Sequence, residues 1–384
     1  MNRIIHARII LPDEIIEDGS ILFDGKIRAV SRDSEADDAD TVIEADDADT
    51  VIDAEGATVI PGLIDLHIHG YNGFDVSDGN TNGVIKMAED IAKNGVTAFL
   101  PTTMTLSYGE LNTAFDSVRE AMASGTESGA EILGIHAEGP FINPERCGAQ
   151  PKEYSVPPDA DFVIKNKDVI RIITVAPEMD EDLKAIKRIK AETDVVVSFG
   201  HTTADYETVS KSIAAGVSHA THLFNAMTGL NHRQPGAVGA ALSSPAVSCE
   251  LICDTFHINP AIFPIVSAAK GDKLVLITDS MRANGLPDGT YTLGGQEVCV
   301  CGIRCQLPNG TIAGSVLKLN HAVNNAVKSG ISVNAAVNAA SLNPARVLGL
   351  DGERGSLEVG KRADIVICDR EFNVKTVFRA GKQL

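Results

Sequence analysis

The sequence predicts an α/β fold: a TIM-like (β/α)8 barrel that carries a small β-sandwich domain built from both ends of the chain. In the middle of the chain, short apolar runs rich in β-branched residues alternate with amphipathic segments, as in a parallel sheet buried on both faces. Eight such runs occur over about 230 residues, which is close to the size of a barrel of this type. Both chain ends instead show short strand patterns separated by glycine turns, which predicts one β-domain assembled from the two ends.

The first 58 residues are predicted to form short strands. An apolar run at 4–11 is followed by strand patterns at 20–23 and 26–30. A tandem acidic repeat comes next, ADDADTVIE at 36–44 and ADDADTVID at 45–53. The repeat lacks the glycine and closing glutamate of an EF-hand loop, so we interpret it as a surface strand or loop and not as a calcium site.

The barrel pattern begins where this region ends. Its predicted strands lie at 58–69, 96–102, 131–138, 171–178, 195–201, 218–223, 248–254 and 273–279. Amphipathic patterns between them predict helices at 83–94, 111–123, 180–193, 204–215 and 260–269. A Rossmann-type sheet is the alternative architecture, but no G-x-G-x-x-G motif follows the first strand.

The segment after the last predicted strand has three parts. A glycine-rich insert at 284–315 has the pattern of a hairpin, helical patterns continue to about residue 348, and the tail returns to short strands. The insert contains Cys299, Cys301 and Cys305, but C-x-C-x3-C is not a strong zinc spacing, so we interpret these cysteines as structural. The sequence therefore divides into a small β-sandwich domain, 1–58 and 355–384, and a catalytic barrel, 59–354.

The composition excludes several classes of protein. The formal net charge is −19 and no Lys/Arg-rich patch is present, so we expect neither nucleic acid nor an anionic membrane as a partner. No apolar run approaches the ~20 residues that span a bilayer, and the N-terminal segment lacks a signal-peptide pattern. Seven cysteines, an odd number spread along the chain, indicate reduced thiols and hence a cytoplasmic protein.

Metal-capable side chains lie where predicted barrel strands end. In a barrel of this kind the carboxyl ends of the strands meet at one face, where active sites are built. Each of these side chains alone is a weak signal, but five separate strand ends supply them, and His, Glu and Asp are ligand types suited to Zn or Fe. The set consists of His67, His69, Glu138, His201, His222 and Asp279. Alternation along a strand also puts His67 and His69 on one face, toward one ion.

Five motifs at these strand ends resemble a known family. PGLIDLHIHG, HAEGPF, FGHT, THLFNAM and ITDSM, in this order, resemble the N-acetylglucosamine-6-phosphate deacetylases of the amidohydrolase superfamily. PGLIDLHIHG and the closing GSLEVGKRADIV mark only the superfamily, whereas HAEGPF followed by THLFNAM is much more specific to the deacetylases. The resemblance covers nearly the whole chain, and it implies the same barrel and β-sandwich architecture.

The resemblance implies a divalent metal centre, Zn or Fe, with one or two ions per chain. Glu138, His201 and His222 would hold the main metal. His67 and His69 would hold a second metal, with Glu138 bridging the two. Some members of the family lack this H-x-H pair and keep one metal, so the pair makes two sites possible here.

The resemblance also implies the reaction. The acetamide of N-acetylglucosamine 6-phosphate would be hydrolysed to glucosamine 6-phosphate and acetate, with metal-activated water as the nucleophile. An amide is a poor electrophile and its amine a poor leaving group, so a group that moves protons is required. Asp279 would be this general base and acid.

The implied substrate-binding residues come from several loops. Asn225 and Ala226 would bind the phosphate end, Arg233 would supply its positive charge, and His257 would assist; the set is completed by Ala149, Gln150, Ile312, Ala313 and Gly314. Family members are typically homodimers or homotetramers in which a neighbouring subunit contributes a phosphate contact. Two departures from the family pattern occur: Gln150 stands where many relatives have a carbonyl-polarising histidine, and Thr255 replaces the glycine of D-G-x-H before His257.

Two other functions remain open at this point. Cyclic-amide hydrolases, guanidine-type hydrolases and amine deaminases of the superfamily usually have a carboxylated lysine after the fourth strand, where this chain has Ala176-Pro177-Glu178. A catalytically inert sugar-phosphate-binding barrel is the second alternative. Of the remaining histidines, His136 is expected to support the site from behind, and the others are interpreted as surface or local hydrogen-bonding groups: His6, His219, His232 and His321.

Overall fold

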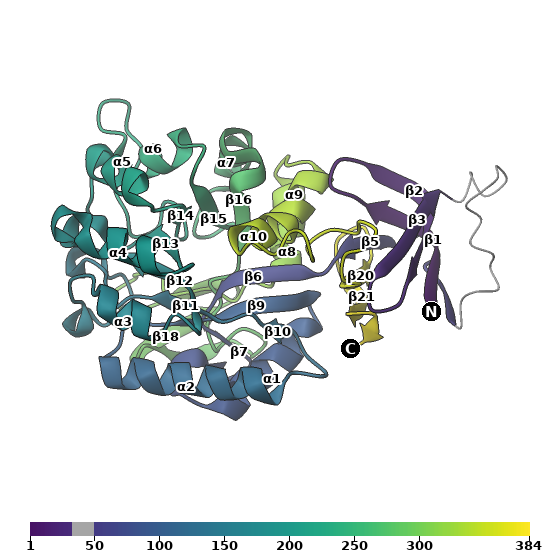
Figure 1. Ribbon diagram of the computed structural model, residues 1–384, viewed down its shortest axis with the longest axis horizontal. Helices are drawn as coiled ribbons and strands as arrows, with labels where there is room; N and C mark the ends of the chain where they lie inside the picture. The colour runs from purple at the N-terminus through teal and green to yellow at the C-terminus, as the bar shows by residue number, and fades with distance from the viewer. Residues whose placement is uncertain (33–49) are drawn as a thin grey trace.

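The computed structural model describes residues 1–32 and 50–384. Figure 1 shows a barrel beside a smaller sheet, and both chain termini lie at the small sheet. The acidic repeat lies outside the described residues up to residue 49, and the end of its second copy forms the short strand β4 (Thr50–Asp53).

The small sheet is built from both ends of the chain. Its strands run in the order β22-β21-β20-β5-β1-β2-β3, with β4 paired to β1. They are β1 (Asn2–Ile10), β2 (Ile15–Phe23), β3 (Ile27–Arg32), β5 (Thr58–Pro61), β20 (Ile365–Cys368), β21 (Val374–Arg379) and β22 (Lys382–Gln383). The rings of Phe23 in β2 and Phe378 in β21 are 5.2 Å apart although these strands are not neighbours, so the sheet folds over an apolar core of its own.

The middle of the chain forms the predicted barrel of eight parallel strands. They are β6 (Leu63–Ile68), β9 (Val96–Thr103), β11 (Ile135–Glu138), β12 (Ile170–Val175), β13 (Val196–Phe199), β14 (His219–Ala220), β15 (Ser248–Ile252) and β16 (Leu274–Ile277). A further strand, β10 (Glu131–Ile132), pairs with β9. A parallel bridge between Ile68 and Ser280 joins the first strand to the end of the last, and Thr278 Oγ1 donates to Asp65 over 2.7 Å at the same seam.

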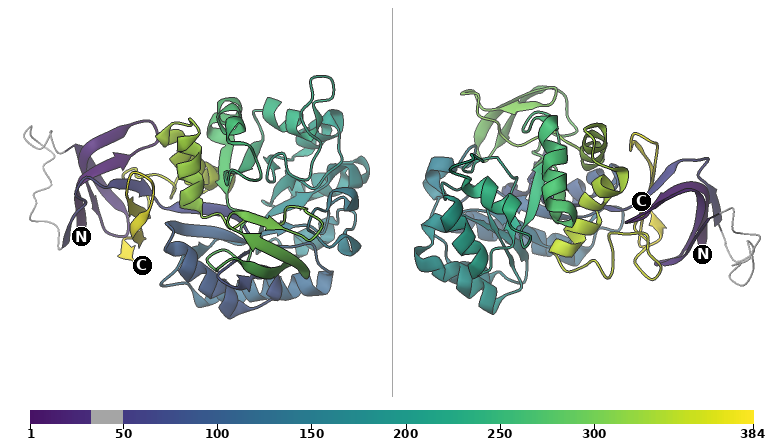
Figure 2. Two further views of the ribbon diagram at one scale, coloured as in Figure 1. Left: turned by 180° about the vertical axis from the view of Figure 1, so that it is seen from behind. Right: turned by 90° about the horizontal axis from the view of Figure 1, so that it is seen from above.

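Helices between the barrel strands and after the last of them cover the outside of the barrel (Figures 1 and 2). They are α1 (Thr81–Ala92), α2 (Tyr108–Ser124), α3 (Ala160–Lys165), α4 (Lys184–Glu192), α5 (Tyr206–Ala215), α6 (Gly236–Ser243), α7 (Phe263–Lys270), α8 (Leu319–Lys328), α9 (Val333–Ala339) and α10 (Leu342–Val347). The sequence pattern did not reveal α3 and α6. The first is very short, and the second, GAVGAALS, is apolar and largely buried, so it has no amphipathic period.

The first predicted strand, 58–69, divides into two strands that belong to different sheets. Residues of β5 pair with β20 in the small sheet, whereas β6 pairs with β9 in the barrel. Gly62 lies at the junction, and a Cβ atom there would come within 2.2 Å of Thr97 Oγ1, so the chain can pass only with a glycine. The small sheet therefore extends to Pro61, beyond the predicted division at residue 58.

The insert after the barrel forms the predicted hairpin, extended to three strands. These are β17 (Gly289–Leu293), β18 (Gln296–Cys301) and β19 (Arg304–Gln306), and the view from behind in Figure 2 shows them over the barrel. Gln296 Nε2 donates to the carbonyl of Ala149 over 2.7 Å, and the Arg304 guanidinium lies 5.5 Å from the centre of the Phe256 ring. The insert is thus fixed to two barrel loops.

Two predictions from composition can be compared with the structure. All seven cysteines, each in the described part of the chain, are free thiols, as expected. In residues 1–32 and 50–384, none of the helices combines the length and the apolar character that crossing a membrane requires.

Candidate metal centre and active site

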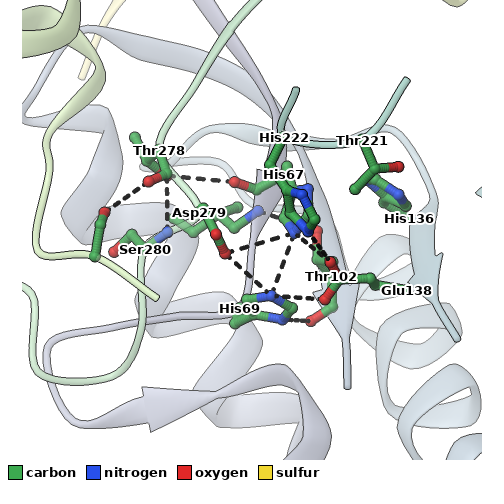
Figure 3. Close-up of polar contacts among 12 residues, drawn as sticks. His67, His69, Thr102, His136, Glu138, Thr221, His222, Thr278, Asp279 and Ser280 are labelled. Carbon is green, nitrogen blue, oxygen red and sulfur yellow. Dashed lines mark hydrogen bonds and ion pairs between the residues drawn. The ribbon is translucent and has the colours of Figure 1, made fainter. Parts of the chain in front are cut away.

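The six side chains predicted for the metal centre lie together at the carboxyl ends of the barrel strands. Figure 3 shows most of them, with His67, His69, His222 and Asp279 directed at the space beside Glu138. All of them are buried or nearly so, with Asp279 the most exposed at 8%. Since these side chains come from segments more than 200 residues apart, closure of the barrel is what brings them together.

Three of the site residues lie just past their strands in an unusual backbone conformation. His201, His222 and Asp279 have φ values of 46°, 30° and 50°, in the left-handed region that side chains other than glycine rarely adopt. Such strain persists only where the surroundings fix it, and it gathers at functional sites. In contrast, His67 lies within the regular strand β6 and His69 directly follows it.

The carboxylate of Glu138 is the centre of the cluster. His222 Nε2 and His201 Nε2 lie 2.8 and 3.1 Å from Glu138 Oε1, and 3.0 Å from each other. Gly139, which follows Glu138, has φ 91°, a conformation suited to glycine. A Cβ atom on Gly139 would lie 2.1 Å from Thr105 Oγ1, so the backbone beside Glu138 is held close to Thr105. One carboxylate oxygen therefore faces two imidazole nitrogens at once.

His67 and His69 approach the same carboxylate from the other side. His69 Nε2 lies 3.2 Å from Glu138 Oε2, and His67 Nε2 lies 3.6 Å from Glu138 Oε1. Asp279 Oδ1 lies 3.3 and 3.6 Å from the same two nitrogens, which are 3.2 Å apart. Glu138 thus lies between two histidine pairs, and Asp279 faces the H-x-H pair.

In three of the four histidine rings, the contacts of Nδ1, the nitrogen that points away from the cluster, show that Nε2 carries the free lone pair. Each outer nitrogen, Nδ1, contacts a group that can only accept: His67 at Glu250 (3.0 Å), His69 at the Thr102 carbonyl (3.2 Å) and His201 at the Arg146 carbonyl (2.8 Å). In the neutral ring Nδ1 then carries the hydrogen, and Nε2 presents a bare lone pair. These lone pairs face carboxylates, which are acceptors too, so the cluster requires positive charge among its members.

The ionisation of the cluster reflects the same requirement. Burial alone would lower the pKa of His222, but its hydrogen bond to Glu138 and the charges of Glu138 and Asp279 raise that pKa to about 9. Burial alone would raise the pKa of Glu138, but the charges of His67 and His201 hold it well below its ordinary value. The histidine charges likewise hold the pKa of Asp279 below its ordinary value against burial. A divalent cation could replace the protons that the histidines otherwise attract.

The donor set fits a divalent metal at two adjacent positions. One group of three is Glu138, His201 and His222, and another is His67, His69 and Glu138; within each, the ligand atoms lie within 4.8 Å of one another. Imidazole nitrogens with one shared carboxylate are typical ligands of Zn or Fe. The residues therefore fit both the one-metal and the two-metal arrangement.

A cavity of about 420 Å³ opens beside the cluster. Its lining includes most of the substrate-binding residues predicted from the sequence: Ala149, Gln150, Asn225, Ala226, His257, Ile312 and Gly314. Ala313 is 1% exposed and does not line the cavity. Arg233 is exposed in the loop before α6, where its backbone N–H donates to Asn231, and it does not line the cavity of its own chain either.

The two departures from the family pattern have clear structural consequences. Gln150 is buried, its amide nitrogen donates to Glu138 Oε2, and its amide oxygen accepts from the Thr105 N–H over 2.6 Å. Thr255 adopts φ 68°, a conformation that would favour glycine, and His257 still lines the cavity with Nδ1 2.6 Å from Asp254 Oδ2.

Among the charged residues that sequence analysis missed at this site, two contact predicted metal ligands. Glu250 in β15 is completely buried and contacts His67, the backbone N–H of His222, and His219. A single acid within the apolar run of a buried strand was the available signal, since such a charge needs partners. Arg146 lines the cavity, and only its position a few residues after EGPF could have indicated this.

The remaining histidines divide into two groups. His136 packs behind the site as expected, with its ring centre 4.6 Å from that of His67 and its Nε2 2.8 Å from Thr174 Oγ1. His219 differs from the interpretation as a surface or local group, because it is fully buried with Nε2 3.0 Å from Glu250. The others are exposed: His6, His232 and His321.

Comparison with known proteins agrees with this fold. Residues 58–384 match the model of the amidohydrolase family. The chain is 40% identical over 375 residues to the N-acetylglucosamine-6-phosphate deacetylase of Bacillus subtilis (strain 168), covering 95% of this chain and 92% of that protein. It is 37% identical over 327 residues to the N-acetylgalactosamine-6-phosphate deacetylase of Escherichia coli O157:H7, covering 84% and 86%.

A solved structure extends the comparison to three dimensions. A mutant of the N-acetyl-D-glucosamine-6-phosphate deacetylase of Mycobacterium smegmatis, in complex with N-acetyl-D-glucosamine-6-phosphate, superimposes with a TM-score of 0.89 at 30% identity, over 99% of this chain and 98% of that chain. The chain therefore belongs to the amidohydrolase family. The three similar proteins named above are deacetylases of N-acetylated amino-sugar phosphates, which confirms the resemblance seen in the motifs.

Proposed function

We propose that this chain hydrolyses the acetamide of N-acetylglucosamine 6-phosphate to glucosamine 6-phosphate and acetate. The observation that supports this most is the Glu138 cluster of four histidines with Asp279, which opens onto a cavity large enough for a sugar phosphate. The Bacillus subtilis relative, which shares 40% identity over most of the chain, is named for the same reaction.

The metal ligands follow from the two groups of donor atoms. Glu138, His201 and His222 would hold the main divalent ion, and His67 and His69 would hold a second ion with Glu138 shared. The donor types favour Zn or Fe. When bound, the metal would polarise the amide carbonyl and lower the pKa of a water molecule.

Asp279 is the residue that we assign to proton transfer. Its carboxylate faces the H-x-H pair, and the low pKa of Asp279 keeps it in the form that accepts a proton. It would take the proton from the attacking water and pass it to the nitrogen of the departing amine, which cannot leave as an anion. The left-handed backbone of Asp279, fixed by its N–H donating to the His67 carbonyl over 2.9 Å, holds the carboxylate in this position.

The substrate would lie along the cavity with its acetamide at the metal centre. Asn225 and Ala226, with His257, would bind the phosphate end, and Gln150 would keep the Glu138 carboxylate in place. Arg233 would then reach the phosphate only from a second copy of the chain or after its loop moves, in keeping with a homodimer or homotetramer. The chain of −19 net charge needs such local cations to favour a phosphate.

Other functions are less well supported. The N-acetylgalactosamine-6-phosphate deacetylase among the relatives makes the epimeric sugar the second candidate. A superfamily hydrolase that needs a lysine after the fourth strand is disfavoured, because Glu178 lies there and its carboxylate accepts from the Thr203 N–H and from Asn143. An inert binding barrel would not explain the strained backbone at the three site residues that follow their strands, because strain of this kind gathers at functional sites. The free thiols favour a cytoplasmic location.

Acetate release would test this proposal directly. Purified protein of measured metal content would be assayed with N-acetylglucosamine 6-phosphate, its galactosamine epimer, and unphosphorylated N-acetylglucosamine. We expect acetate from the first substrate at the highest kcat/KM and little from the last. A metal-loaded protein that releases no acetate from any of the three would contradict the proposal, and preference for the epimer would change the sugar.

A further inference from the structure

Glu250 lies behind the metal centre and outside the cavity, yet it contacts both halves of the histidine cluster. Its carboxylate is 0% exposed in strand β15. One oxygen, Oε2, lies 3.0 Å from His67 Nδ1 and accepts the backbone N–H of His222 over 3.0 Å. The other oxygen, Oε1, lies 3.0 Å from His219 Nε2. Every contact of this buried charge is therefore with an imidazole or with the backbone of a predicted metal ligand, within the part of the chain that the structure describes.

The contact with His67 determines which ring nitrogen is available. A carboxylate can only accept, so it holds the hydrogen of the neutral ring on Nδ1 and leaves the lone pair of His67 on Nε2. That nitrogen lies 3.6 Å from Glu138 Oε1 and 3.6 Å from Asp279 Oδ1. The Glu250 contact also fixes the plane of the His67 ring, against the His136 ring on its other side.

We propose that Glu250 is a positioning residue, which orients His67 for the second metal and couples that histidine to the backbone of His222. The single oxygen Oε2 contacts both the His67 ring and the backbone N–H of His222, so one atom fixes a member of each histidine pair. This inference rests on the proposed two-metal arrangement. Carboxylates that receive the outer N–H of a metal-bound histidine typically change metal affinity by about tenfold to a hundredfold when they are removed.

A metal bound by Glu250 itself is the competing interpretation, because His67, His136 and Glu250 also lie close enough to hold an ion. The hydrogen bonds disfavour it. Both nitrogens of His136 are already engaged, Nδ1 with the Leu66 carbonyl over 3.0 Å and Nε2 with Thr174. Both oxygens of Glu250 are engaged as well, so an ion there would displace several existing bonds.

Three variants separate a positioning role from a merely structural one. Glu250→Gln keeps an oxygen acceptor for His67 and His222, provided that His219 moves its hydrogen to Nδ1, which has no hydrogen-bond partner in the described structure. Glu250→Leu removes the acceptor with little change in volume. His219→Gln is the matched control, because its amide can still donate to Oε1 while the His67 contact is untouched.

The experiment titrates metal-free protein with Co²⁺ or Zn²⁺ by calorimetry and visible absorption, after circular dichroism has verified the fold. We expect two binding steps in the wild type. The second step should weaken by about a hundredfold in Glu250→Leu and by about tenfold in Glu250→Gln, while both steps of the His219→Gln variant stay close to wild type. Nitrogen-15 spectra of the zinc-saturated protein should show His67 with its hydrogen on Nδ1 and the metal on Nε2 in the wild type and in Glu250→Gln, and not in Glu250→Leu.

The outcomes distinguish this inference from the function on which it rests. Two steps of unchanged affinity in Glu250→Leu would overturn the positioning role alone. If Glu250→Leu fails to fold, an unchanged second step in Glu250→Gln would overturn that role in the same way. A wild type that binds only one ion would overturn the two-metal arrangement and this inference with it, while leaving the deacetylase proposal to the acetate assay.

Discussion

The two histidine pairs that face Glu138 are built in different ways. His67 and His69 belong to a regular strand and its end, and their outer nitrogens contact groups deep in the barrel, Glu250 and the Thr102 carbonyl. His201 and His222 lie past their strands with positive φ, and the Nδ1 atom of His201 contacts the backbone carbonyl of the exposed Arg146.

The difference shows that one metal centre can rest on two kinds of support. The strand pair, His67 and His69, is fixed by regular structure and by buried acceptors behind it. The loop-end pair, His201 and His222, is fixed by tertiary contacts that hold a strained backbone, and strain of this kind is retained where function needs the geometry. We therefore expect the loop-end pair, with Glu138, to be indispensable and the strand pair to adjust the activity.

The largest effect should come from the loop-end pair. His201→Ala removes a ligand of the main metal, so metal content should fall and turnover should drop by more than the ~100-fold to 10,000-fold typical of losing a general acid or base. Elemental analysis and acetate release on one preparation would measure both. The exposed His232→Ala is the matched control, and equal metal in His201→Ala and wild type would refute the ligand assignment.

Asp279→Asn should separate proton transfer from metal binding. The amide keeps the size of the carboxylate but cannot accept the water proton, so turnover should fall at least about a hundredfold with metal content and fold intact. Steady-state kinetics with metal analysis would show this, with the exposed Asp272→Asn as control. Near-normal turnover would mean that another group moves the proton.

Arg233→Ala should affect only phosphorylated substrates. One charge-assisted contact is worth about 1.5–3 kcal/mol, so kcat/KM for N-acetylglucosamine 6-phosphate should fall roughly tenfold to a hundredfold, with little change for N-acetylglucosamine. Arg146→Ala is the matched variant, because Arg146 lines the cavity of its own chain whereas Arg233 does not. This variant keeps the backbone carbonyl that holds His201. Equal losses on both substrates in Arg233→Ala would remove this arginine from the phosphate site.

The strand pair should give a smaller effect. Replacing His67 and His69 together with Ala should lower the metal content by about one ion per chain. Part of the deacetylase activity should survive, because the main ligands are untouched. Metal content and acetate release would both be measured, and unchanged stoichiometry would show that the H-x-H pair is structural.

The pH should act on the metal-free protein with a defined sign. The folded state raises the pKa of His222 from its ordinary value near 6.5 to about 9, so the protonated ring stabilises folding fully below pH ~6.5, and this contribution is lost as the pH rises through 9. Metal must displace the same proton, so metal affinity should rise across that range. Thermal unfolding after chelation and calorimetry at several pH values would test both trends. An apo protein that gains stability from pH 6.5 to 9 would contradict the assignment.

Much of this arrangement could be predicted from the sequence, for identifiable reasons. The repeated alternation of buried strands and amphipathic helices indicated the barrel, and the two-residue period placed His67 and His69 on one face. The helix α6 could not be predicted because it is apolar all round. The left-handed backbone at His222 and the partners of Glu250 could not be predicted either, since both depend on contacts between distant segments.

The positions of bound ions in a crystal would test the central claim most directly. Anomalous diffraction at the absorption edge of the metal found in the purified protein would locate each ion independently of any assay. We expect one strong peak within ~2.0–2.2 Å of Nε2 of His201 and His222 and of a Glu138 oxygen, and a second beside His67 and His69. A metal-loaded crystal with its peaks away from Glu138 would contradict the account.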